Sequence, residues 1–322
     1  MAIGKASDFV IYQPQFHTGM TEVMTQQANV FNANSNGAIT LSTEQMKGDF
    51  DQRAFFELVE DIVTRRNTAS TSVVEDEPLT QNEDIHVKLA RRFQIAQTLD
   101  AFRKIGADPR QLSLVVGRQV GKAVMVDYLN TAIAAADVAF AKTYEVDRSN
   151  ATLNHSHLVD AMSMLGDAGQ NVIAYVMHSK PFYNLMQQSI ADKIFEVAGV
   201  TIHTGTVASL NRPVIVSDIP GLVDVDAGGS GINHYHTLAL TRNAITVKET
   251  EGREVVSRIV DGHENLFMRI QGEHAYNIGL KGYKWNTAAG INPTDAALTT
   301  ANNWIKNVSE DKSTGGVRLI TL

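Results

Sequence analysis

Residues 109–140 are the feature that most constrains the fold. Asp108-Pro109 is a strong helix start, because aspartate caps a helix N-terminus and proline suits the first helical position. An apolar stripe then recurs at helical spacing and continues to the end of the segment: Val116, Val120, Val124, Tyr128, Leu129, Ile133, Ala136 and Phe140. Roughly thirty residues span about 45 Å as a helix, which predicts a structural spine. Arg118, Lys122 and Asp127 interrupt it and argue against a membrane helix.

Composition narrows the class of protein. The chain has 322 residues, with 28 Lys and Arg against 35 Asp and Glu, so its formal net charge is −7. A surface that grips phosphate backbones is normally basic, so nucleic-acid binding is disfavoured as the main function. The absence of cysteine excludes disulfides, cysteine nucleophiles and thiolate metal sites. We expect one large domain or two intimate ones, with no secretory signal and no membrane.

The N-terminal part predicts an arm followed by a long two-stranded excursion. Residues 1–50 are polar, with one short helix expected over 21–31. Residues 51–66 show an apolar face at helical spacing and predict a second helix. The β-forming residues 68–74, an acidic turn and the alternation of residues 85–89 then predict a ribbon. Because a two-stranded ribbon is marginal in water, it needs a partner surface.

The rest of the chain predicts an α+β fold in which helices pack on a mixed sheet. We expect helices over 157–165 and 180–197, with a buried strand over 171–178 between them. Further strands are expected at 200–203, 214–218, 236–241, 244–250, 255–259 and 265–285. The sequence contains no repeat of fixed period.

Motifs that could carry chemistry are weak in this sequence. The segment 117–123 has only three residues between its glycines and no hydroxyl after its lysine, unlike a phosphate-binding loop, so close helix packing explains it better. His234 and His236 share one face of a strand, downstream of Asp224 and Asp226, which is a donor set for a divalent metal. Solvent-exposed histidines are nevertheless the expectation. We predict no catalytic, cofactor-binding or metal-binding residues.

The order of parts is more informative than any motif. A polar arm, a long loop and a spine helix precede a helix–strand–helix region that closes on the strand Pro213-Val214-Ile215-Val216-Ser217-Asp218. The final run of strands ends on Gly282-Tyr283-Lys284-Trp285. Over residues 1–286 this order resembles the major capsid proteins of tailed bacteriophages, which have the Hong Kong-type capsid fold.

The resemblance implies a role for each part of the chain. Residues 1–64 would be an N-terminal arm, and residues 65–98 an extended loop. Residues 99–150 and 242–286 would form a peripheral domain built on the spine helix, and residues 151–241 an axial domain at the five-fold and six-fold centres. Residues 287–322 would be a C-terminal extension. The extension carries apolar groups that a solvated tail would not need.

The function that the resemblance implies is assembly, without enzymatic activity or a cofactor. Copies would join through pentamers and hexamers into an icosahedral shell around double-stranded DNA, first in the host bacterial cytoplasm and then in the virion. There is no room before the arm for a scaffolding segment of about 100 residues. A separate scaffolding protein and a portal at one vertex are therefore the expected partners, and a decoration protein stays open.

Charged residues of the extended loop are the predicted inter-subunit contacts. Five acidic residues lie within ten positions: Glu75, Asp76, Glu77, Glu83 and Asp84. Three basic residues follow on the return strand: Lys88, Arg91 and Arg92. Like charges on an isolated ribbon repel, so Lys or Arg of a neighbouring subunit is expected beneath the acidic tip. Lys88 is expected to be a surface residue rather than the donor of an isopeptide crosslink.

Two alternatives stay open at this point. The same fold builds encapsulin nanocompartments, which hold cargo enzymes, although the long arm and the missing cargo-pocket signature favour a phage shell. The second alternative is a metal-dependent hydrolase that uses His234, His236 and Asp224. Co-purified enzyme cargo would favour the first alternative, and a small oligomer with tightly bound zinc would favour the second.

Overall fold

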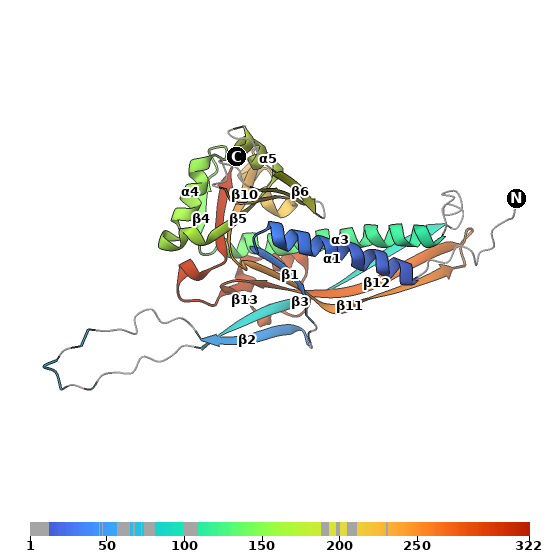
Figure 1. Ribbon diagram of the computed structural model, residues 1–322, viewed down its shortest axis with the longest axis horizontal. Helices are drawn as coiled ribbons and strands as arrows, with labels where there is room; N and C mark the ends of the chain where they lie inside the picture. Colours follow the sequence, from blue (N-terminus) through green and yellow to red (C-terminus); the bar gives the residue numbers. More distant parts are fainter. Residues whose placement is uncertain are drawn as a thin grey trace.

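Two β-sheets share one long helix in this subunit (Figure 1). The computed structural model describes residues 13–44, 46, 48–56, 65–66, 68–71, 73, 81–98, 109–187, 193–197, 200–204, 211–229 and 231–322. One sheet is drawn out beneath the helix into an elongated half, and the other belongs to a compact half above one end of it. The predicted α+β class with a mixed sheet is confirmed, with two sheets in place of one.

Helix α3 (Pro109–Phe140) is the predicted spine and has the predicted bounds. The predicted stripe faces the core, where Val120, Val124 and Tyr128 are buried. Residues 113–140 are long and apolar enough to cross a membrane by length and composition, but 61% of the most apolar window is buried inside the protein. Burial against the rest of the chain is what a core helix of this length requires.

Helix α1 (Gln13–Asn34) lies along α3 and extends the predicted 21–31 helix in both directions (Figure 1). Its buried side chains are Phe16, Met20, Met24 and Phe31. Gly117 and Gly121 of α3 let the two helices approach, because a Cβ on Gly117 would overlap the Phe16 carbonyl and one on Gly121 would lie 3.0 Å from the Met20 carbonyl oxygen. The interpretation of these glycines as packing residues is therefore confirmed.

The elongated half is a seven-stranded sheet within the described residues. Its main path runs β1 (Ile39–Thr43), β11 (Ile245–Val260), β12 (Phe267–Leu280), β13 (Tyr283–Trp285) and β14 (Trp304–Lys306). Strand β3 (Gln81–Thr98) also pairs with β12, and β2 (Phe50–Phe56) pairs with β3. One face of this sheet packs under α1 and α3 and forms the main core with them.

The compact half is an eight-stranded sheet within the described residues. Its order is β4 (Glu145–Arg148), β15 (Gly316–Thr321), β10 (His234–Thr241), β5 (Val172–Met177), β8 (Val214–Val216), β7 (Val200–Thr204) and β6 (Lys193–Val197), with β9 (Val223–Asp224) beside β10. Alternate residues of β5 pack into two different hydrophobic cores. Ala174 and Val176 belong to the core around the spine helix. Tyr175 belongs to a second core with residues of α4 (His155–Ser163) and α5 (Ser179–Met186).

Residues 287–322 contribute to both sheets. Strand β14 pairs with β13 in the first, and β15 lies between β4 and β10 in the second. The short helix α6 (Asp295–Leu298) precedes them. Trp304, Val317 and Leu319 are fully buried, as predicted for the apolar groups of this segment, whereas Ile305 is 39% exposed.

Three predicted elements differ from the structure. Residues 50–56 form strand β2 where the pattern predicted a helix over 51–66, because pairing with β3 satisfies their backbone groups; residues 57–64 lie outside the described part. The helix predicted over 180–197 ends at Met186, and β6 occupies 193–197. The strands predicted at 244–250 and 255–259 are one strand, β11, with register shifts between Glu249 and Glu254.

Candidate inter-subunit surfaces

The predicted contact residues lie along strand β3, where the structure describes them. Glu75, Asp76 and Glu77 fall outside the described residues. Glu83 and Arg92 are exposed, and Arg92 stands opposite Glu273 in the β3–β12 register. Their side chains are therefore accessible to a second subunit.

Two of the predicted basic residues already have partners within the same chain. Lys88 forms an ion pair with Glu251 of β11. Arg91 pairs with Asp295 and lies 3.3 Å from Asp127 of α3. These carboxylates and the nearby Tyr276 hydroxyl outweigh burial and raise the pKa of Arg91. Arg91 therefore ties β3 to the spine helix and the C-terminal segment, a role that the sequence pattern did not indicate.

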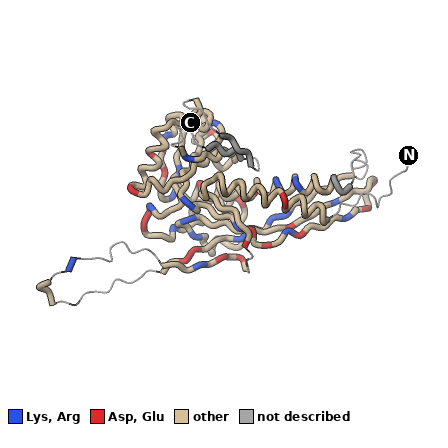
Figure 2. The backbone as a smooth tube through the Cα atoms, viewed as in Figure 1, with Lys and Arg blue, Asp and Glu red and all other residues tan. Residues whose placement is uncertain are grey.

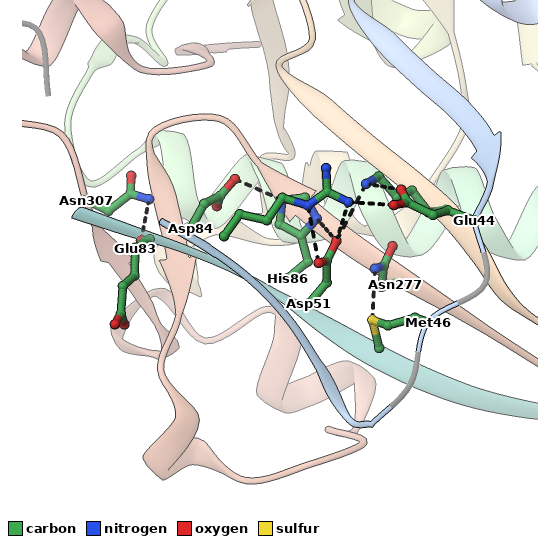
Figure 3. Close-up of polar contacts among 10 residues, drawn as sticks. Glu44, Met46, Asp51, Glu83, Asp84, His86, Asn277 and Asn307 are labelled. Carbon is green, nitrogen blue, oxygen red and sulfur yellow. Dashed lines mark hydrogen bonds and ion pairs between the residues drawn. The ribbon is translucent and has the colours of Figure 1, made fainter. Parts of the chain in front are cut away.

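A polar cluster that the sequence did not predict lies where β2 and β3 leave the sheet (Figure 3). Its residues are Glu44, Asp51, Arg53 and Lys248. Arg53 Nη2 lies 2.7 Å from Glu44 Oε1 and 3.1 Å from Asp51 Oδ2, and Lys248 Nζ lies 2.5 Å from Glu44 Oε2. Burial opposes ionisation of Asp51, but Arg53, Lys248 and His86 together lower its pKa. The cluster anchors the base of the extended loop to β1 and β11.

Asp84 and His86 complete this base. His86 Nε2 lies 3.1 Å from Asp84 Oδ2, and the imidazole is buried against Gly279 of β12, where a Cβ would overlap the ring. Asp84 belongs to the predicted inter-subunit contacts, but its Oδ2 atom already has a partner, His86, in the same chain. Strand β3 pairs with β2 on one side and with β12 on the other. The sequence spacing could not predict these strand pairs, because the paired residues are far apart in the chain.

The histidine pair has a different environment from the predicted one. His236 is 2% exposed, so the expectation of two solvent-exposed histidines is wrong for it, and His234 is half-buried. His236 Nδ1–H donates to Asp137 Oδ2 of α3 at 2.9 Å, and Nε2 lies 3.3 Å from Asp224 Oδ2. Arg318 of β15 lies 3.2 Å from the same Asp137 oxygen. This buried node links the spine helix to the compact half.

The node predicts a pH dependence of stability. Burial disfavours the His236 cation, but the hydrogen bond to Asp137 and the charge of that carboxylate outweigh burial and raise the pKa above 6.5. A raised folded-state pKa gives a stabilisation that is complete below the unfolded value and is lost as pH rises through the folded value. We expect urea midpoints of the wild type to fall between about pH 6 and pH 9 more than those of His236→Gln. Arg318, Asp224 and Glu145 also face this node.

His263→Gln is the matched control for this pH prediction, because His263 is exposed in the β11–β12 turn. It should keep the wild-type pH dependence. An equal fall in the midpoint for wild type and His236→Gln would show that the His236–Asp137 pair does not set the pH response.

Charge is mixed along the subunit. Figure 2 shows Lys and Arg interspersed with Asp and Glu along both halves of the described chain. Among the described residues, no group of three or more His, Asp or Glu side chains has a metal-binding arrangement. The described ion pairs all lie within the chain, and the protein as a whole carries a net charge of −7.

Comparison with known proteins identifies the family. A structure from Mycobacterium phage Cain matches with a TM-score of 0.54 at 10% identity, covering 88% of each chain. The capsid of Ralstonia phage GP4 matches with a TM-score of 0.54 at 11% identity, covering 89% of this chain and 87% of the other. These likenesses confirm the expected capsid fold. Comparison with curated protein sequences returns no relative.

The family model described as "Major capsid protein 13-like" matches residues 8–318. This span includes both sheets, the spine helix and nearly all of the C-terminal segment. The chain therefore belongs to the major capsid protein 13-like family, and it is a capsid shell protein of the virion.

Proposed function

We propose that copies of this chain join through pentamers and hexamers into an icosahedral shell that encloses double-stranded phage DNA. The observation that carries the proposal is the family match over residues 8–318, on a fold with an elongated half and a compact half. Assembly takes place in the host bacterial cytoplasm, with a separate scaffolding protein and a portal at one vertex. The shell carries no enzymatic activity in this proposal.

In this proposal the two halves of the fold have different places in a capsomer. The compact sheet with α4 and α5 is the axial domain, which meets its copies at the capsomer centre. The elongated sheet under α1 and α3 is the peripheral domain. Because β4 and β15 belong to the compact sheet, residues 145–148 and 316–321 would move with the axial domain, in addition to 151–241. The remaining parts are the arm, 1–64, and the extended loop, 65–98.

The shell wall need not hold its contents tightly. Mixed charge along the described chain and a net charge of −7 support enclosure of DNA without sequence-specific binding. The encapsulin alternative gains no specific support from the structure. The hydrolase alternative is disfavoured by the ion pairs of His236, whose two ring nitrogens face Asp137 and Asp224.

The acidic tip of the extended loop should act between subunits. Reversing Glu75, Asp76 and Glu77 to Lys should leave the subunit folded and weaken assembly, because each exposed ion pair contributes about 0–1 kcal/mol and many copies act together. The defect should vary with salt, since screening at about 0.15 M acts over about 8 Å. Circular dichroism and sedimentation across ionic strengths measure both effects. The neutral variant Glu75→Gln, Asp76→Asn, Glu77→Gln should show a smaller defect; normal shells from the reversed variant at every salt concentration would show that these acids are only solvated.

Electron microscopy of negatively stained particles tests the proposed function. The purified protein, expressed with and without a candidate scaffolding protein, should give closed shells or isolated capsomers. Folded protein that forms neither shells nor five-fold or six-fold capsomers under both conditions would contradict the proposal. Co-purification of one enzyme inside the shells would favour a nanocompartment over a phage capsid.

A further inference from the structure

Strands β11 and β12 place like charges directly opposite each other. Glu254 of β11 stands opposite Glu273 of β12, and Arg258 stands opposite Arg269, in the antiparallel register. Directly opposed residues share one face of a sheet with their Cβ atoms about 5 Å apart, so like charges at such positions destabilise the sheet. The subunit therefore carries one acidic and one basic repulsive pair on the same two strands.

Both pairs lie on the face that points away from the helices. The alternate residues Val255, Met268 and Ile270 are buried in the core with α1 and α3, which lie over the other face of the sheet (Figure 1). Because side chains alternate along a strand, the four charged residues point to the opposite side, where all four are exposed. None of the four side chains forms an ion pair or hydrogen bond within the part of the chain that the structure describes.

Strand β3 offsets only the acidic pair. Arg92 stands opposite Glu273 on the other side of β12, so a positive charge neighbours the two acids. The position opposite Arg269 on β3 is Ala96, which has no charge. The arginine pair therefore has no acid at its level on any of the three strands.

A shallow hollow of about 530 Å³ lies on this face, lined by both charged pairs. Val256 and Gln271, which stand opposite each other between the two pairs, line it as well. Val256 is 50% exposed. Along each strand the order is thus acid, uncharged residue and base, at intervals of two residues, or about 7 Å.

This pattern is complementary to itself. A two-fold axis that lies in the plane of the contact, and crosses the strands at Val256 and Gln271, places the acidic row of one copy over the basic row of the other. Two sheets packed face to face with nearly aligned strands lie about 10 Å apart, a gap that Glu and Arg side chains together can bridge. The rotation therefore adds four attractive contacts to the two repulsive pairs, and it places Val256 against Val256 of the second copy.

A second copy fits this face better than a nucleic acid does. A phosphate backbone is negative along its whole length, so it would meet the acidic row as well as the basic row. The same face of a second copy presents the opposite charge at both rows. Charge complementarity thus selects this occupant.

We propose that two soluble subunits form a two-fold dimer through the outer face of β11 and β12. Glu254 and Glu273 of each copy pair with Arg258 and Arg269 of the other. Five-fold and six-fold rings are built from heterologous contacts, whereas this contact is isologous, so it is separate from the proposed pentamers and hexamers. Because the face is confined to one pair of strands, the dimer is weak and is weakened further by salt.

Charge reversal of one row tests the dimer. The acidic-face variant, Arg258→Glu with Arg269→Glu, should keep the wild-type circular dichroism, because both side chains are exposed. Its face carries four acids, so its self-association constant should fall at least about tenfold in sedimentation velocity across protein concentrations. The neutral variant Arg258→Gln with Arg269→Gln should show a smaller fall.

Mixing two variants separates self-docking from every other use of this face. The basic-face variant, Glu254→Arg with Glu273→Arg, should also fail to associate with itself, but an equal mixture with the acidic-face variant should form dimers. Lys122→Glu with Lys180→Glu is the control of equal charge change, because both lysines are exposed and lie outside this face; it should associate like the wild type. A monomeric wild type, unchanged self-association of both face variants, or no dimer in the mixture would overturn the proposal.

A single thiol tests the position of the two-fold axis. The chain has no cysteine, so Val256→Cys introduces one thiol that faces its own counterpart across the axis. A short bis-maleimide reagent should link two copies of this variant at protein concentrations where dimers form. Val159→Cys, at a 45% exposed position on α4, should give little linked dimer. Equal linking of the two cysteine variants would place the contact elsewhere and contradict the assignment.

Discussion

Val124→Asp is expected to leave the subunit unable to fold. Val124 lies on the buried stripe of α3, within the core shared with α1 and the elongated sheet. An aspartate there would bury a charge without a partner, which costs several kcal/mol. Whole domains are stable by only about 5–15 kcal/mol, so the variant should be found in the insoluble fraction after expression. Soluble yield and circular dichroism of any soluble fraction are the measurements.

Val115→Asp provides the matched comparison on the same helix. Val115 is exposed, so its replacement should change stability by less than about 1 kcal/mol in the isolated subunit. Soluble, normally assembling Val124→Asp protein would mean that the stripe of α3 faces solvent, and the account of the core would be wrong.

Gly117→Ala should have the second largest effect, through the contact between α1 and α3. A methyl group at this position overlaps the backbone carbonyl of Phe16, and a backbone cannot swing aside as a long side chain can. Overpacking of this kind costs about 1–3 kcal/mol, so we expect a clear fall in the urea midpoint. The helix propensity gained by alanine, about 1 kcal/mol, offsets only part of this.

Gly252→Ala controls for the substitution itself. No atom lies within 4 Å of a Cβ at Gly252, and this glycine has no positive φ, so alanine should be neutral or slightly stabilising there. If Gly117→Ala unfolds at the wild-type urea concentration, α1 does not pack against α3 at this glycine.

The spine helix could be predicted because its signals are local. A cap, a proline and a repeated apolar stripe all lie inside residues 108–140, and tertiary contacts only reinforce them. Strands β5 and β8 were predictable for the same reason, since buried strands read as short apolar runs. The match between the order of parts and the capsid fold also required only the sequence.

The base of the extended loop could not be predicted in this way. Phe55 and Phe56 fit a helical face, yet residues 50–56 pair with residues 81–87, and a partner far along the chain overrides a local preference. The helix predicted over 180–197 failed similarly, because residues 193–197 pair with β7.

The charged sites depend on still longer separations. Asp137 and His236 are 99 residues apart, and Arg318 reaches Asp137 across 181 residues. The sequence spacing shows the pair His234 and His236, but it does not show that Asp137 is the hydrogen-bond partner of His236. Likewise the basic character of β3 was evident, while the pairing of Lys88 with Glu251 depended on the β3–β12–β11 arrangement.

Electron cryo-microscopy of particles assembled from this chain tests the central claim most directly. The account predicts closed shells built of five-fold and six-fold capsomers, with the compact sheet at each capsomer centre and the elongated half at its periphery. A reconstruction of folded protein as a small oligomer without shell closure, or with the elongated half at the symmetry axis, would contradict it.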